Sequence, residues 1–242
     1  MTQYPALRNA ALWCIKAGIP IRDELLANLA SVGIGVKALQ DYSNAMTREV
    51  LIYLNVLRVH PGLAGGEFGV NFAGVIERGL NEAWRLGMRE NNATEMLEEW
   101  QAIVDEAIAS ERTHISDFAA YLVQVVGNTA DTGAAIAQAR SRLEMWINRY
   151  EDLRHQAIIA SADEKTKLIW QVGPTEHCQD CAQLDGMVAF AREWEQAQIR
   201  PQDKMLACHG FKCQCSLTPT NERHTRGALE KLMRIHEAQI RR

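Results

Sequence analysis

Five of the six cysteines lie between Cys178 and Cys215, and this cluster constrains the fold more than any other feature of the 242-residue chain. Cys178 and Cys181 form a CxxC turn, which places two sulfurs on one side of a tight knuckle where both can bind one ion. The second group, Cys208, Cys213 and Cys215, follows in the run ACHGFKCQC. The segment predicts a small module in which a metal ion, rather than a large apolar core, fixes the chain.

The cluster offers more ligands than one tetrahedral zinc ion needs. Five thiols and two neighbouring histidines, His177 and His209, compete for four positions, and the second group reads CxxxxCxC rather than CxxC. The preferred ligands are Cys178, Cys181, Cys208 and Cys213, with Cys215 as the substitute. A disulfide pair in a particle exposed to oxidation is the alternative to a metal.

Catalytic motifs are missing around the cysteines. A catalytic zinc ion keeps an open position beside a general base, as in HExxH or in HxE followed by PCxxC, and neither pattern occurs in the sequence. Glu176 is a lone acid beside Cys178, and a histidine adjacent to a cysteine in sequence seldom supplies triad geometry. We therefore expect a closed structural zinc site, no catalytic residue and no enzyme activity.

Composition indicates a soluble globular protein, with 47% hydrophobic and 23% charged residues. The net charge of -4 argues against a protein that coats nucleic acid along its whole surface, but it leaves room for a local basic patch. The N-terminal sequence lacks a basic region followed by a long apolar core, and no run approaches the roughly 18 apolar residues of a membrane span. We expect neither secretion by this route nor insertion into a membrane.

Helical periodicity dominates the chain before the cysteines. The first 60 residues indicate helices broken by small-residue turns, and within them the apolar positions from Val36 predict a helix of two or more turns. After a glycine-rich connector at 60–69, Asn71 is expected to cap the next helix, and residues 94–126 could form one helix of about 50 Å. Asp131 or Thr132 is expected to cap a further helix. The predicted buried stripes are Val36, Leu39, Met46, Val50, Tyr53, Leu54 and Leu57; Phe72, Val75, Ile76, Leu80, Trp84 and Met88; Leu97, Trp100, Val104, Ile108, Ile115, Phe118, Leu122 and Val125; and Ile136, Leu143, Trp146, Tyr150 and Leu153.

Charged residues on these helices suggest surfaces rather than a second metal site. Glu111 with His114 and Asp152 with His155 have the spacing of ligands in carboxylate di-iron bundles, which also need carboxylates from two other helices. The flanking Arg112 and Arg154 suggest a solvent-facing surface, so surface or satisfied polar residues are the preferred interpretation. The acids at Glu95, Glu98, Glu99 and Asp105 indicate a solvated face, with a docking surface for a basic partner as the alternative.

The pattern changes at Lys167. LIWQV predicts a short strand, GMVAFA a second strand and REWEQAQ one or two helical turns, while GALEKLMRIHEAQIRR predicts a terminal helix that either docks or stays solvated. We expect a mainly α protein with a helical region at 1–162, a small C-terminal α+β zinc-knuckle-like module at 163–220 and a helical tail at 221–242.

The cysteine segment resembles the phage Mu F-like head morphogenesis family. That family has a tryptophan strand, a CxxC, a Leu-x-Gly and a later HPxCRC-like end, and the resemblance extends over about Ala134 to Thr220. The matching positions are Trp170, Cys178, Cys181, Leu184, Gly186, Cys213 and Cys215. The family histidine falls at Gly210, so Cys208 is its expected replacement. Gln214 stands where the family usually has an arginine, and no role of that arginine is transferred.

The resemblance implies a minor head, or minor capsid, protein of a tailed phage or prophage that acts in capsid assembly near the portal. Its implied partners are the portal and capsid proteins, with possible contact to packaged DNA and with no membrane or small-molecule substrate. Its implied location is the phage head, and the bacterial host cytoplasm during assembly. The alternatives are a zinc-knuckle nucleic-acid-binding protein, suggested by Arg200, Lys204, Lys212 and the basic tail, and a hydrolase or injected effector.

Overall fold

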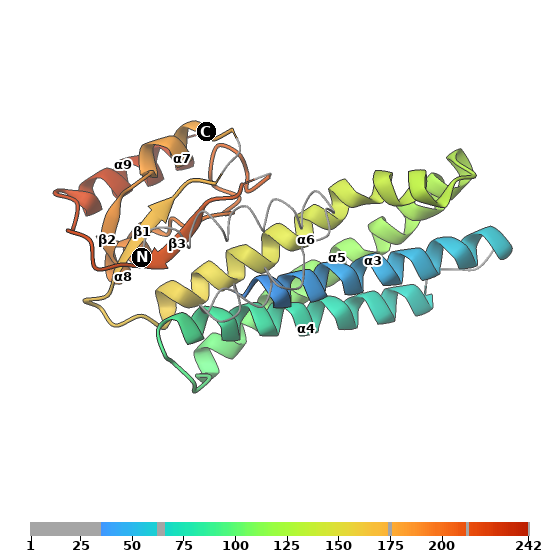
Figure 1. Ribbon diagram of the computed structural model, residues 1–242, viewed down its shortest axis with the longest axis horizontal. Coiled ribbons are helices and arrows are strands. Elements are labelled where there is room, and N and C mark those ends of the chain that lie inside the picture. The colour runs from blue at the N-terminus through green and yellow to red at the C-terminus, as the bar shows by residue number, and fades with distance from the viewer. Residues whose placement is uncertain (1–34, 62–65, 174–175, 212, 242) are drawn as a thin grey trace.

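The computed structural model describes residues 35–61, 66–173, 176–211 and 213–241. Four long helices form a bundle, and a small module with a three-stranded sheet lies at one end of it (Figure 1). The bundle contains α3 (Val36–Val59), α4 (Gly66–Glu90), α5 (Glu98–Asn128) and α6 (Thr132–Ala160). The module contains β1 (Lys167–Gln171), α7 (Gln179–Leu184), β2 (Val188–Phe190), α8 (Ala191–Ala197), β3 (Ser216–Pro219) and α9 (Ala228–Ile240). The mainly helical class is confirmed, while the helices expected before residue 35 lie outside the described residues.

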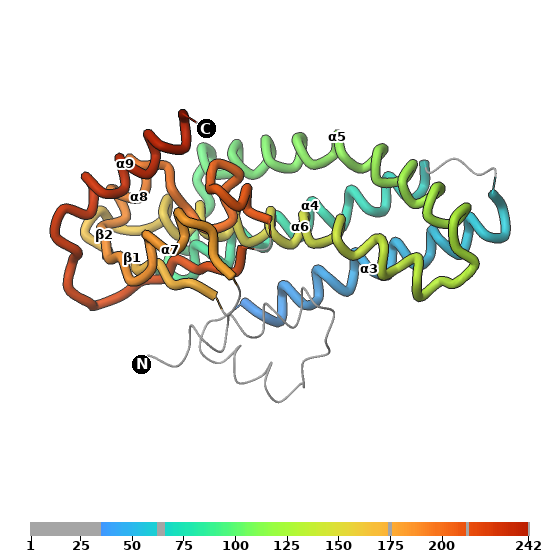
Figure 2. Tube along the Cα trace, turned by 90° about the horizontal axis from the view of Figure 1, so that it is seen from above, coloured from blue at the N-terminus to red at the C-terminus, as the bar shows by residue number. Residues whose placement is uncertain are grey.

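The bundle core is built from the predicted apolar stripes. Every residue predicted for α3 and α4 is buried, and only Leu97, which lies at the N-cap of α5, is clearly exposed among the rest. Phe72, Phe118 and Trp146 come from three helices, and their ring centroids lie 5.0 to 5.5 Å apart. Trp146 makes T-shaped contacts with both phenylalanines, whose own rings are tilted against each other. In the view of Figure 2, α5 and α3 lie on opposite sides of α4 and α6. No described helix combines the length and apolarity needed to cross a membrane.

Helix α4 begins earlier than predicted. Asn71 is not a cap but an exposed residue inside the helix, which starts at Gly66. Phe68 explains the extension, because its ring is buried and stacks on Tyr53 at a centroid distance of 4.4 Å. Burial of an aromatic side chain outweighs the roughly 1 kcal/mol by which each glycine disfavours a helix.

The C-terminal half of α6 corrects a second prediction. Asp152, Arg154 and His155 do not form a polar surface, because their exposed fractions are 4%, 2% and 0%. Periodicity assigns a helix one buried face, but this stretch of α6 lies between the bundle and the module and is covered on all sides. Asp131 caps the other end of α6, as expected, by accepting hydrogen bonds from the backbone amides of Gly133 and Ala134.

The module is organised around an antiparallel sheet in the order β2-β1-β3. The two predicted strands and the helix after them are confirmed as β1, β2 and α8. Sequence reasoning missed β3, which contains Pro219; because β3 is an edge strand, it tolerates a residue that cannot donate to a ladder. Trp170 of β1 stacks on Trp194 of α8 at 5.9 Å in a separate second core.

Two helices, α6 before the sheet and α9 after it, complete the second core. Ile158 and Ile159 at the end of α6 belong to it, so α6 contributes to both cores. Leu232 and Ile235 of α9 are also buried there. Of the two alternatives for the terminal helix, docking on the chain's own body is therefore the one observed.

Candidate metal centre

All five clustered cysteines meet in the module. Their sulfurs form two groups that share Cys181, one with Cys178 and Cys208 and the other with Cys213 and Cys215, and within each group the sulfurs lie within 4.8 Å of one another. Cys181, Cys213 and Cys215 are at most 5% exposed. None of the described cysteines forms a disulfide bond. The gathering expected from the sequence is therefore observed for every predicted ligand.

The CxxC turn is shaped by the start of α7. Cys178 is the N-cap residue, and its sulfur accepts a hydrogen bond from the backbone amide of Cys181 at 3.4 Å. This contact folds the two cysteines back on the same side, as a shared ion requires. Sequence reasoning missed α7, because its six residues are too few to show a helical period.

The loop at 198–215 carries the other three cysteines and is fixed by two specific contacts. The Gln202 side-chain amide donates to the carbonyl oxygens of Cys213 and Cys215, at 3.2 and 2.9 Å. Gly210 has a φ of +71°, and a Cβ there would lie 2.2 Å from the Gln202 carbonyl oxygen. Any side chain at the position of the family histidine would therefore collide with this loop.

Close contacts among the thiols raise the pKa values of Cys181 and Cys208 and lower that of Cys213. Hydrogen bonds from Cys181, and then from Cys208 and Cys215, hold the pKa of Cys213 well below its usual range. The pKa of Cys181 is raised by its hydrogen bonds, first with Cys208 and then with Cys213. For Cys208, the hydrogen bond with Cys181 lowers the pKa, but the contact with Cys213 and burial outweigh it and raise the pKa to about 12. Among the thiols whose pKa is shifted, Cys213 is therefore the one whose pKa is lowered.

The spacing of the sulfurs suits a tetrahedral thiolate site. A zinc–sulfur bond of about 2.3 Å places two tetrahedral ligand sulfurs roughly 3.8 Å apart. The Cys181 and Cys213 sulfurs are 4.0 Å apart. Soft thiolate ligands in this arrangement select zinc, copper(I) or iron. The five cysteines can hold such an ion, and the choice of the four ligands remains open because Cys181 belongs to both groups of three.

The two candidate histidines behave differently from the cysteines. His209 is exposed, and its Nδ1 lies 3.1 Å from the backbone carbonyl of Lys204. Neither His209 nor His177 belongs to a potential ligand group among the described residues. Cys208 does belong to one, with Cys178 and Cys181.

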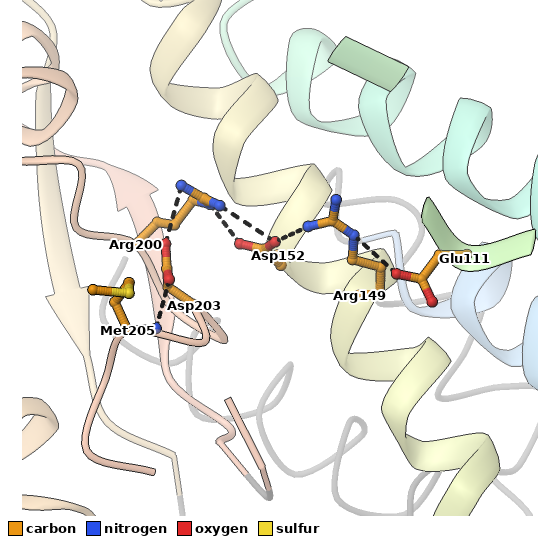
Figure 3. Close-up of polar contacts among 6 residues, drawn as sticks. All are labelled: Glu111, Arg149, Asp152, Arg200, Asp203 and Met205. Carbon is orange, nitrogen blue, oxygen red and sulfur yellow. Dashed lines mark hydrogen bonds and ion pairs between the residues drawn. The ribbon is translucent and has the colours of Figure 1, made fainter. Parts of the chain in front are cut away.

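A chain of ion pairs joins the cysteine loop to the bundle (Figure 3). Asp152 of α6 accepts from Arg149 at 2.5 Å and from Arg200 of the loop, and Arg149 also pairs with Glu111 of α5 at 3.4 Å. Arg200 further pairs with Asp203 at 3.1 Å. Glu111, Arg149, Asp152 and Arg200 border a cleft of about 700 Å³ between α5, α6 and the loop. Glu111 and Asp152 therefore bind arginines, and the described ExxH and DxxH residues form no metal site.

Comparisons with known proteins complete the description of the site. No family model, curated protein or solved structure matches this chain.

Proposed function

We propose that this protein is a minor head protein of a tailed phage or prophage, which joins portal and capsid proteins during head assembly. The observation that carries the proposal is the set of residues that resemble the Mu F-like family, since they lie in one folded unit and each has a structural role there. Trp170 and Leu184 are fully buried in the second core. Gly186 turns the chain before β2 with a φ of +69°, and the remaining motif positions are clustered cysteines.

We further propose that the centre holds one structural zinc ion. A four-thiolate tetrahedral site is typical of zinc, and three of the five sulfurs come from buried residues, which favours a closed coordination shell over a catalytic one. In this function the ion stabilises a module whose strands and short helices are otherwise held by a small core.

Exposed apolar side chains on the bundle support a role in assembly. Val59 of α3 is 71% exposed and Val70 of α4 is 73% exposed. Val70 also lines a cavity of about 680 Å³ together with Ile115 and Val123 of α5, and a contiguous apolar surface is suited to contacts with other proteins. The portal and capsid proteins of the same particle are the partners that we propose.

Two measurements test the proposal. A tagged copy is expected to co-purify with the portal or the major capsid protein of its phage, and virions that lack the protein altogether would contradict the assignment. Elemental analysis should find about one zinc ion per chain, and Cys178→Ser should lower both the zinc content and the Tm. Metal-free protein of unchanged stability would argue against the zinc ion.

Assays on the same purified protein distinguish the two alternative functions. A nucleic-acid-binding function predicts salt-dependent DNA binding that is lost when Lys204 and the basic tail are neutralised. The geometry gives it less support, because Arg200 is engaged by Asp152 and Asp203, and Arg234 pairs with Glu230 on its own helix. A hydrolase or injected effector predicts turnover that is lost in Glu176→Gln.

A further inference from the structure

Asp180 is a buried carboxylate at the metal centre, and the proposed zinc function does not yet include it. It lies between the two cysteines of the CxxC turn and is 2% exposed. Its Oδ2 accepts a hydrogen bond from the backbone amide of Ala207 at 2.9 Å, and the side-chain amide of Gln239 donates to the same oxygen at 3.4 Å. One oxygen therefore joins the knuckle, the cysteine loop and α9.

The contact with Ala207 lies next to the third sulfur of the CxxC group in the sequence. Ala207 directly precedes Cys208, and Cys208 belongs to the sulfur group of the CxxC turn. The loop that carries Cys208 belongs to no strand, and the nearby Gln202 contacts fix only the carbonyls of Cys213 and Cys215. A charge-assisted hydrogen bond to the preceding residue thus ties the Cys208 segment to the knuckle, in addition to the hydrogen bond between the Cys208 and Cys181 thiols.

Asp180 itself is not a ligand candidate, since it belongs to neither group of potential ligand atoms among the described residues. Its carboxylate is used by the backbone amide and by Gln239 instead. Groups that hold metal ligands in place in this way typically change metal affinity by 10- to 100-fold when they are removed.

We propose that Asp180 is a positioning residue that holds Cys208 in bonding range of the metal bound by Cys178 and Cys181. This inference rests on the proposed metal centre. It identifies Cys208 as a ligand whose contribution depends on the carboxylate, and it gives the acid inside the CxxC turn a role that a solvated acid would not have.

The test measures zinc affinity in the full chain by competition with a chromophoric chelator, with the cobalt(II) spectrum as a second report of thiolate coordination. Asp180→Ala is expected to weaken zinc binding by roughly 10- to 100-fold. Asp180→Asn, which keeps the shape but not the charge, should have a smaller effect. In a Cys208→Ala background, Asp180→Ala should cause no further loss, because the ligand through which it acts is gone.

Asp203→Asn is the matched control. Asp203 is also a buried carboxylate of the cysteine loop that accepts a backbone amide, that of Met205 at 2.8 Å, but it faces Arg200 instead of the cysteines. The zinc affinity of the Asp203→Asn variant should stay within about threefold of the parent value, a change below the range expected for a positioning residue. Near-ultraviolet circular dichroism of each variant at saturating zinc shows what fraction is folded, so a loss of affinity can be separated from a loss of folded protein.

The outcomes distinguish the inference from the proposed metal centre. Parent protein that takes up neither zinc nor cobalt overturns the metal centre itself. Zinc uptake by the parent together with unchanged affinity in Asp180→Ala overturns only the role of Asp180. An equal loss on Asp180→Ala with and without Cys208 also overturns it, because the carboxylate would then act on the module as a whole.

Discussion

The bundle and the module use different means to specify one structure. Bundle helices run from 24 to 31 residues, and their stripes bury large aromatic and aliphatic side chains in one core. In the module, strands have three to five residues and the second core includes cysteine side chains. Long helices gain enough buried area to fix their own packing, whereas short elements depend on a local cross-link. The cysteine centre is that cross-link in our proposal.

The seam between the two parts differs from both cores. Asp152, Arg149 and Arg200 place opposite charges between α6 and the cysteine loop, with side chains from 6% to 28% exposed. Such pairs stabilise little by themselves, but removing one partner leaves the other poorly solvated. The seam therefore fixes how the parts fit, and the two cores supply the stability.

The largest effect is expected from Cys181→Ser, which removes the sulfur that both groups share. The module should lose its metal and its tertiary structure, while the bundle keeps its helices. Zinc analysis, near-ultraviolet circular dichroism and limited proteolysis after residue 162 measure this outcome. Val188→Ala truncates the same module at a buried position and should retain the metal. Full zinc occupancy in Cys181→Ser would contradict the shared role of this cysteine.

The converse experiment targets the bundle. Phe118 is 1% exposed and contacts Phe68, Phe72 and Trp146. Phe118→Ala should destabilise the bundle by roughly 3–5 kcal/mol, the usual range for a large aromatic cavity, without lowering zinc content in the folded protein. Denaturant unfolding measures the loss, and Val123→Ala on the exposed face of α5 is the control. Loss of zinc from folded Phe118→Ala would show that the metal centre depends on the packing of the bundle.

At the seam, Asp152→Asn removes the charge that two arginines share. The expected destabilisation is about 1–3 kcal/mol, since Arg149 and Arg200 stay partly buried without their partner. Hydrogen exchange should increase in the cysteine loop near Arg200 more than in α3. A uniform increase over the whole bundle would instead mean that Asp152 stabilises the helices themselves.

The pH dependence reports the same seam with a smaller effect. Burial raises the pKa of Glu111 above its ordinary value of 4.5, although Arg149 lowers it, and burial also raises the pKa of Asp203 above 3.8. Folded protein then binds these protons more tightly than unfolded protein does, so this contribution to stability is complete below the ordinary pKa values and is lost as the pH rises through the raised ones. When the Tm is measured from pH 4 to 7, the Tm of Glu111→Gln should increase relative to that of the parent protein as the pH rises, by a few degrees. A constant difference would contradict the raised pKa.

The smallest effect is expected from His209→Asn. The ring of His209 faces the Lys204 carbonyl instead of the sulfurs, and asparagine tolerates the φ of +51° that this position requires. Zinc content should be unchanged, and the Tm should shift by less than the error of most scans. Cys208→Asn, compared directly, should reduce metal affinity.

The sequence predicted the parts of the fold that depend on one periodic face. The stripes of α3 and α4, the Asp131 cap, the solvated acids of α5, and β1, β2 and α8 all agree with the structure. The start of α4 was wrong, because the burial of Phe68 is decided by Tyr53 on another helix. The predicted exposure of the charged residues of α6 was also wrong. These residues are enclosed by the module, and no local sequence pattern indicates where the module lies.

For the candidate site, residue types and spacing were sufficient to name all five cysteines. They were insufficient for the residues that hold the cysteines in place. Asp180 stands in the CQDC run and could have been noticed as an acid between two ligands, but its partner Ala207 is distant in sequence. Gln202 gives no signal at all, since its contacts are to backbone carbonyls of the loop.

Helix α6 has a mechanical consequence. Its 29 residues span about 43 Å, and after Gly133 it contains neither glycine nor proline at which to bend. Tyr150 and Leu153 anchor it in one core, and Ile158 and Ile159 anchor it in the other. A force applied to the module is therefore transmitted along the helix axis into the bundle. The two parts are joined by a continuous helix and not by a flexible linker.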